Sequence, residues 1–123
     1  MGEINAVVGL EQLKQLNFFR EKRLELVKLY LERIKKSKHY FKILNFKSKS
    51  IFWHLFVINL NKKYYRSKKN LMLNLKSNKI GTQVHYKPIS EHQSIKKNII
   101  LKNNKHAILF YKSQLSLPLH VNL

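Results

Sequence analysis

Apolar residues recur at helical spacing through the first 36 residues of the chain. One stripe follows intervals of three and four residues, which is typical of a single helix face; it comprises Ile4, Val7, Val8, Leu10, Leu13 and Leu16. A second stripe lies opposite a face of Glu, Lys and Arg, and comprises Phe19, Leu26, Val27, Tyr30, Leu31 and Ile34. Asn17 separates the two stripes, and Asn caps helices more readily than it occupies their interior. The pattern therefore predicts two helices that meet near Asn17.

The middle of the chain changes from strand to helix patterning. Residues 53–60, "WHLFVINL", are rich in β-branched and aromatic types and predict a buried strand. A shorter strand is expected over residues 40–46, within a connection. Residues 68–78 are amphipathic and follow Ser67, so they predict a helix, and the glycine at position 81 is placed to act as its C-terminal cap.

The last third of the chain predicts two further strands and one helix. Residues 82–86 predict a strand that Pro88 ends, because proline cannot donate to a β ladder. We expect a loop from there to about Asn104. A short helix over 106–113 and a strand over 115–119, interrupted by a proline, complete the pattern.

This order of elements indicates an α+β fold in which helices cover a small sheet. At 123 residues the chain is expected to form a single domain over 1–123. Within it we expect a long helical segment over residues 1–36 and an α+β portion over residues 37–123.

The charge of the chain is strongly positive and uneven. The formal net charge is +19, of which +16 falls on residues 37–123. Such a surface attracts nucleic acid non-specifically at low salt, and a small basic nucleic-acid-binding protein is one alternative function. However, 21 of the 25 cations are Lys and only 4 are Arg, whereas base and phosphate recognition favours Arg. Lys, Asn and Ile are enriched together, which codon bias alone produces.

Composition excludes several classes of site. The chain has neither Cys nor Asp, so it holds no disulfide, thiolate metal site, Cys nucleophile or Asp-based triad. The six histidines form no H-x-x-x-H pair, and no metal site is expected. The longest apolar run has ten residues, against about 20 for a membrane span, and we expect a cytoplasmic protein without a membrane partner.

Four segments, in order, resemble one family. They are "MGEINAVVGLEQLKQLNFFREKR", "WHLFVINL", "KSNKIGTQVHYKPI" and "FYKSQLSLPLHVNL". In this order they resemble the C-terminal part of the DegT/DnrJ/EryC1/StrS aminotransferases, pyridoxal-phosphate enzymes that aminate nucleotide-linked keto-sugars. Within the family, "GTQVHYKPI" and "QLSLPLHVNL" are most similar to the UDP-4-keto-6-deoxy-N-acetylglucosamine-derived 4-aminotransferases of pseudaminic-acid synthesis.

The resemblance implies the C-terminal small domain of a fold-type I aminotransferase that depends on pyridoxal phosphate. The implied reaction transfers an amino group from an amino acid, such as glutamate, to a UDP-linked 4-keto-6-deoxy sugar. In the family the cofactor lysine and the acid beside the pyridine nitrogen lie upstream, on the large domain. We therefore expect a truncated small domain without catalytic or cofactor-binding residues, inactive alone. The implied partners are the large domain, a second subunit and the nucleotide-sugar.

The same resemblance implies the candidate site residues. His85, Tyr86 and Pro88 match the strand-end segment that the family places near the substrate entrance, which makes them substrate-side candidates. Support of the turn alone is the other interpretation of His85 and Tyr86. A structural role is favoured for His120 in "LPLH". A decayed, non-functional remnant is a further alternative.

Overall fold

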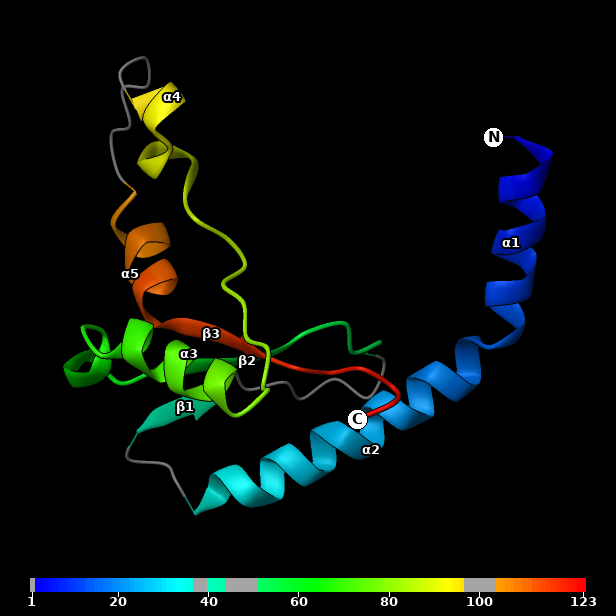
Figure 1. Cartoon of the computed structure of the whole chain (residues 1–123), viewed down its shortest axis with the longest axis horizontal. Helices are drawn as coiled ribbons and strands as arrows, with labels where there is room; N and C mark the ends of the chain where they lie inside the picture. The colour runs from blue at the N-terminus through cyan, green and yellow to red at the C-terminus, as the bar shows by residue number, and fades with distance from the viewer. Residues whose placement is uncertain (1, 37–39, 44–50, 97–103) are drawn as a thin grey trace.

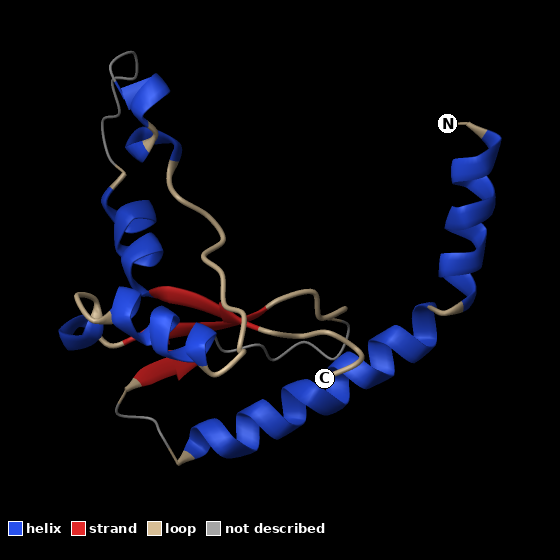
Figure 2. Ribbon diagram, viewed as in Figure 1, coloured by secondary structure: helices blue, strands red, loops and turns tan. Residues whose placement is uncertain are grey.

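A computed structural model describes residues 2–36, 40–43, 51–96 and 104–123 of the chain (Figure 1). Two N-terminal helices lead into a small sheet with shorter helices around it, which confirms the expected α+β class (Figure 2). The helices and strands of the described residues are α1 (Glu3–Lys14), α2 (Leu16–Lys35), β1 (Phe41–Ile43), β2 (Phe56–Leu60), η1 (Lys62–Tyr64), α3 (Lys68–Ser77), η2 (Ile89–Glu91), α4 (Gln93–Lys96), α5 (Lys105–Ser113) and β3 (Gln114–Leu117).

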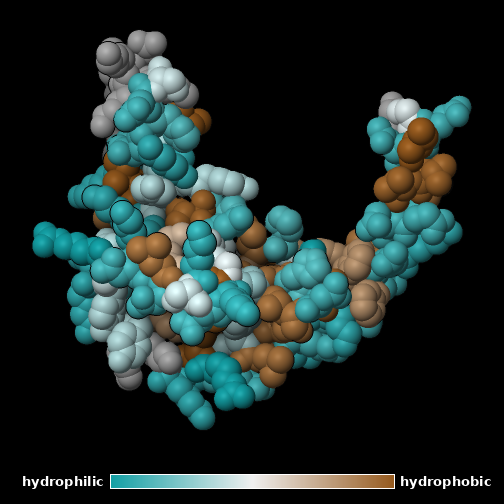
Figure 3. Space-filling model, in the orientation of Figure 1, coloured by the Kyte–Doolittle hydropathy of each residue, from teal (hydrophilic) through white to brown (hydrophobic). Residues whose placement is uncertain are grey.

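The two N-terminal helices meet at Gln15, two residues before the expected break at Asn17. The backbone of Gln15 leaves helical geometry at φ −92° and ψ 1°, and its N–H donates to the carbonyl of Gln12 at 3.1 Å. α1 projects away from the rest of the molecule, whereas α2 runs along the sheet (Figure 1). None of the α1 residues is buried, and Figure 3 shows hydrophobic side chains gathered on this helix.

The sheet has three antiparallel strands in the order β1-β2-β3. Ile58 of β2 is the register partner of Ile43 in β1 and of Leu115 in β3, so these three side chains share one face. The predicted strands at both ends of this sheet are confirmed, and β3 ends earlier than expected. β3 ends at Leu117, directly before Pro118, and residues 44–46 of the first predicted strand lie outside the described residues.

The core lies where α2 covers that face of the sheet. Phe56 is fully buried, and its ring stacks on that of Tyr30 in α2 with 4.8 Å between centroids. The Tyr30 hydroxyl also donates to the carbonyl of Pro118 at 2.9 Å, which joins α2 to the segment after β3. The buried cluster consists of Val27, Ile34, Phe56, Ile58, Leu115 and Leu119. This cluster fixes the position of the chain after β3, from which part of the site is built.

α3 ends differently from the prediction. Its last turn closes in a Schellman motif, in which Ile80 N–H donates to the carbonyl of Leu75 at 2.8 Å and Lys79 N–H to that of Lys76 at 2.9 Å. Lys79 adopts the left-handed conformation, with φ 61°, and no glycine has a positive φ. The prediction that Gly81 caps this helix is therefore wrong: the helix ends at Ser77, its C-cap is Asn78, and the left-handed residue that follows the cap is Lys79.

The segment after α3 pairs less than expected. Over residues 82–86 the structure forms only an isolated bridge between Gln83 and Ser116, not a strand. Neither neighbouring position of this register has a free N–H: Pro118 has none, and the N–H of Gln114 donates to the carbonyl of Phe110 at the end of α5. The expected loop before Asn104 contains two short helical turns, η2 and α4. The last predicted helix is confirmed as α5.

Candidate functional site

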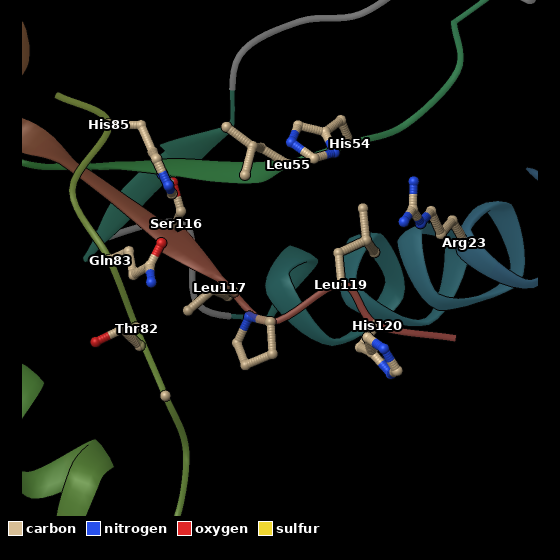
Figure 4. A pocket seen from close by; sticks show the side chains of 12 residues that line it. Arg23, His54, Leu55, Thr82, Gln83, His85, Ser116, Leu117, Leu119 and His120 are labelled. Carbon is tan, nitrogen blue, oxygen red and sulfur yellow. The ribbon is translucent and has the colours of Figure 1, made fainter. Parts of the chain in front are cut away.

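A cavity of about 470 Å³ opens between the N-terminal part of α2, the bridge segment and the chain at the end of β3 (Figure 4). Four separate stretches of sequence supply its walls, because the sheet and α2 bring them together. Its lining residues are Arg23, His54, Leu55, Gly81, Thr82, Gln83, His85, Ser116, Leu117, Pro118, Leu119 and His120. The walls combine apolar side chains with a guanidinium, three imidazoles, an amide and two hydroxyls, a mixture suited to a polar organic ligand.

His85 is the predicted site residue that lines this cavity. Its Nδ1 lies 2.8 Å from the hydroxyl of Ser116, and Figure 4 shows the imidazole directed at that hydroxyl. The backbone of Ser116 exchanges two hydrogen bonds with Gln83, at 2.8 and 3.2 Å. The bridge therefore anchors the chain two residues before His85, and the side-chain contact orients the ring.

The other two candidates lie beside the cavity and do not line it. Tyr86 is 77% exposed, and its ring meets that of His85 edge-on at 4.8 Å. Pro88 is half-buried and directly precedes η2, where it shapes the turn. The peptide bond between His85 and Tyr86 is cis. Of the three predicted residues, the structure thus brings one to the cavity and leaves two on the adjoining turn.

The sequence analysis did not single out five polar residues of the wall: Arg23, His54, Thr82, Gln83 and Ser116. Arg23 donates from Nη1 to the carbonyl of Trp53 at 3.3 Å, whereas its buried Nε has no hydrogen-bond acceptor among the described residues. In sequence Arg23 is one of several cations on the polar face of a helix, so no local signal separates it from them. Ser116 belongs to the quoted "LSLPLH" motif, but it follows His85 by 31 residues, so their contact could not be predicted from the local sequence.

His120, for which a structural role was favoured, lies at the cavity and is exposed. Its Nδ1 accepts a hydrogen bond from the backbone N–H of Asn122 at 3.2 Å. That contact links His120 to the chain after Leu119, and the structural role favoured for His120 stays a prediction.

The cavity does not supply the groups that pyridoxal phosphate requires. The cofactor needs a lysine amine and an acid beside its pyridine nitrogen, and neither a lysine nor a carboxylate lines this cavity. Burial lowers the pKa of Lys68, as a Schiff-base lysine requires. However, Lys68 lies outside the cavity and donates to the carbonyls of Tyr111 and Gln114, at 2.5 and 3.3 Å. The residues that line this cavity therefore do not fit this cofactor.

Two further kinds of site are absent from the described part of the chain. No three His or Glu side chains there are grouped so that they hold a metal ion. Within the same ranges, no helix is both long enough and apolar enough to cross a bilayer.

Comparison with known proteins gives relatives that match this chain over nearly its whole length. The UDP-4-amino-4,6-dideoxy-N-acetyl-beta-L-altrosamine transaminase of Helicobacter pylori is 38% identical over 125 residues, covering 100% of this chain and 33% of that protein. The transaminase of the same name from Campylobacter jejuni, serotype O:23/36, is 36% identical and covers 98% of this chain and 32% of its own length. The chain thus spans about a third of the length of these relatives.

Solved structures show the same relation in three dimensions. Helicobacter pylori PseC, an aminotransferase involved in the biosynthesis of pseudoaminic acid, matches with a TM-score of 0.88 and 38% identity over 100% of this chain and 33% of its own. Spr1654 of Streptococcus pneumoniae, solved in its pyridoxal-phosphate form, has the same fold, with a TM-score of 0.88 at 24% identity over 100% of this chain and 32% of its own. The predicted resemblance is therefore confirmed.

The family model is matched along the whole sequence. The model described as the DegT/DnrJ/EryC1/StrS aminotransferase family aligns with residues 1–123. Together with relatives more than 30% identical over nearly the whole chain, this match shows that the chain belongs to the DegT/DnrJ/EryC1/StrS aminotransferase family.

Proposed function

We propose that this chain forms the substrate-facing third of a sugar aminotransferase that depends on pyridoxal phosphate. The reaction transfers an amino group from an amino acid, most simply glutamate, to a UDP-linked 4-keto-6-deoxy sugar. The names of the Helicobacter and Campylobacter relatives support this substrate class, because a transaminase named for a 4-amino-4,6-dideoxy sugar acts at carbon 4 of such a sugar.

The cavity beside His85 is the observation that carries the proposal. It offers hydrogen-bonding groups from Arg23, Gln83 and His85, which suit the oxygens of a sugar nucleotide, and it has no group for the cofactor. In this proposal His85 contacts the substrate, Tyr86 flanks it at the entrance, and Pro88 holds the turn that presents both. The lysine and the acid that activate the cofactor come from the remaining two-thirds of the family fold.

The exposed apolar face of α1 supports an interaction with the rest of the family fold. Ile4, Val7 and Leu13 are 81%, 61% and 62% exposed, and an isolated helix of 12 residues is marginal in water. PseC matches this chain over 100% of its length, α1 included, and that protein is about three times as long. We infer that the remaining two-thirds of the family fold covers this face, and that a second subunit completes the enzyme.

A chimera tests the proposal. The matching third of the Helicobacter transaminase is replaced by this chain, and the product is assayed with glutamate and a UDP-linked 4-keto-6-deoxy sugar. We expect bound pyridoxal phosphate and sugar-dependent formation of 2-oxoglutarate. This chain alone is expected to show no turnover with added cofactor. A chimera that binds the cofactor as the parent does, yet has no turnover, contradicts the proposal.

A matched pair of variants tests the role of His85 in the chimera. His85→Gln is expected to lower kcat/KM roughly tenfold, about what one hydrogen bond to a ligand oxygen contributes. His92→Gln is the control, because His92 is exposed and lies outside the cavity, and its ring Nε2 lies 3.4 Å from the carbonyl of Lys87. Equal activity of the two variants removes His85 from the substrate site.

A further inference from the structure

Ser116 and His85 form a polar contact at the cavity wall. Ser116 is 4% exposed on β3, and its Oγ lies 2.8 Å from Nδ1 of His85. Among the described residues, the Ser116 hydroxyl forms no hydrogen bond besides this one, and Nε2 of His85 forms none. The backbone bonds between Ser116 and Gln83 hold the chain two residues before His85 beside β3, which brings the two side chains within reach of each other.

The number of protons permits two arrangements of this pair. A neutral imidazole carries one N–H and one lone pair, and a serine hydroxyl carries one proton. If Ser116 donates to Nδ1, the hydroxyl proton and the imidazole lone pair are both satisfied, and Nε2 carries the ring proton. If Nδ1 carries it, His85 donates to Ser116, and the buried hydroxyl proton has no acceptor among the described residues. The second arrangement leaves a buried polar group unpaired, which is unfavourable.

We propose that Ser116 is a positioning residue that holds neutral His85 as its Nε2–H tautomer, with an N–H donor free for a ligand in the cavity. The tautomer of a histidine is set by the hydrogen bond of its other ring nitrogen. A free Nε2–H selects an acceptor oxygen, such as a hydroxyl, carbonyl or phosphate oxygen. The identity of this ligand as a sugar nucleotide rests on the proposed function, whereas the tautomer does not.

Nitrogen NMR of the whole chain tests the tautomer directly. Histidine labelled with ¹⁵N distinguishes a protonated from an unprotonated ring nitrogen by chemical shift, at a pH about two units above the ordinary histidine pKa of ~6.5. His85→Gln identifies the signals. We expect protonated Nε2 and unprotonated Nδ1 in the wild type. A wild-type His85 with its proton on Nδ1 overturns the proposal, whatever the variants do.

Variants at Ser116 then separate positioning from packing. Ser116→Ala is expected to give a mixture of tautomers, and Ser116→Thr, which keeps the hydroxyl, is expected to restore Nε2–H. His120 is an internal control, because its Nδ1 accepts from the N–H of Asn122 and its signals should not change. Backbone amide spectra verify that each variant is folded. An unchanged His85 tautomer in folded Ser116→Ala overturns the assignment of Ser116.

The same variants in the chimera connect the tautomer to binding. Ser116→Ala is expected to raise KM for the sugar nucleotide roughly three- to tenfold, as the loss of one hydrogen bond does, with partial rescue by Ser116→Thr. An unchanged KM beside an altered tautomer refutes the proposed ligand contact. An inactive chimera refutes the proposed function and leaves the NMR result on Ser116 intact, so the two failures are distinguishable.

Discussion

Substitution of Lys79 by glycine should stabilise the protein. Lys79 closes α3 in the left-handed conformation, with φ 61°. For a residue with a Cβ this conformation costs roughly 1–2 kcal/mol, because the Cβ approaches the following carbonyl oxygen. Glycine avoids this cost and loses part of the gain, since it is more flexible in the unfolded chain. The net expectation is a gain of about 1 kcal/mol, with both Schellman hydrogen bonds retained.

Urea unfolding measures this gain. The midpoint should rise at an unchanged m-value, and the melting temperature should rise by roughly 3–6 °C for a domain of this size. Lys79→Ala is the matched control: it removes the same charge and keeps the Cβ, so it should bring no stabilisation. Any effect of charge alone appears equally in both variants.

Gly81→Ala supplies the result that would refute this reasoning. Gly81 has no positive φ, and a Cβ built there meets nothing within 4 Å, so alanine should be neutral or slightly stabilising. If instead Gly81→Ala destabilises by about 1 kcal/mol and Lys79→Gly has no effect, the glycine is the cap, as the sequence pattern predicted. The two hypotheses therefore predict different changes in the free energy of unfolding for both variants.

Three further measurements address the core, the basic surface and two titrating groups. Tyr30→Phe removes the hydroxyl bonded to Pro118 and should lower the free energy of unfolding, measured in urea, by about 1 kcal/mol. Because burial raises the pKa of Tyr30, the wild type should also lose stability above about pH 10, where the unfolded chain ionises first, and the variant should lose less. Lys68→Met should destabilise the folded state because the carbonyls of Tyr111 and Gln114 lose their donor. Burial lowers the pKa of Lys68, so the folded state releases the ammonium proton at a lower pH than the unfolded chain does. The free energy of unfolding of the wild type should therefore gain a contribution as pH rises toward about 10.4, and the variant should lack it. Binding to a labelled DNA duplex should be independent of sequence and should weaken steeply as salt increases; a preference for one sequence over its scrambled version would favour the nucleic-acid-binding alternative.

The helices and strands that bury a continuous apolar face were predictable from the sequence. α2, α3 and β2 carry spacings that reflect one dominant influence, the packing of one side against the core. The cap of α3 was not predictable in this way. Gly81 was favoured because glycine tolerates positive φ, but the last turn of the helix decides where the chain must turn, and that position is occupied by Lys79. The strand expected over residues 82–86 failed for a tertiary reason, since its partner lacks free bonding groups on either side of Ser116.

The site was predictable only where a motif carried it. His85 was indicated by the resemblance, and it lines the cavity. Arg23 and Ser116 are 93 residues apart in the sequence; both lie within segments that resemble the family, but no spacing or residue type there marks either one as part of a site. Their neighbourhood exists only after α2 has packed on the sheet and the bridge to Gln83 has formed. Such residues follow from the fold and not from periodicity or composition.

The core joins distant parts of the chain, and this has a consequence for biosynthesis. Tyr30 bonds to Pro118 across 88 positions, and β2 pairs with β3, which follows it by more than 50 residues. Contacts of such long range form slowly, because a large loop must close before they stabilise anything. During translation the apolar faces of α2 and β2 therefore leave the ribosome before their last partner exists. We expect the nascent chain to engage chaperones until residues 114–119 emerge, and release from them to mark the completion of the core.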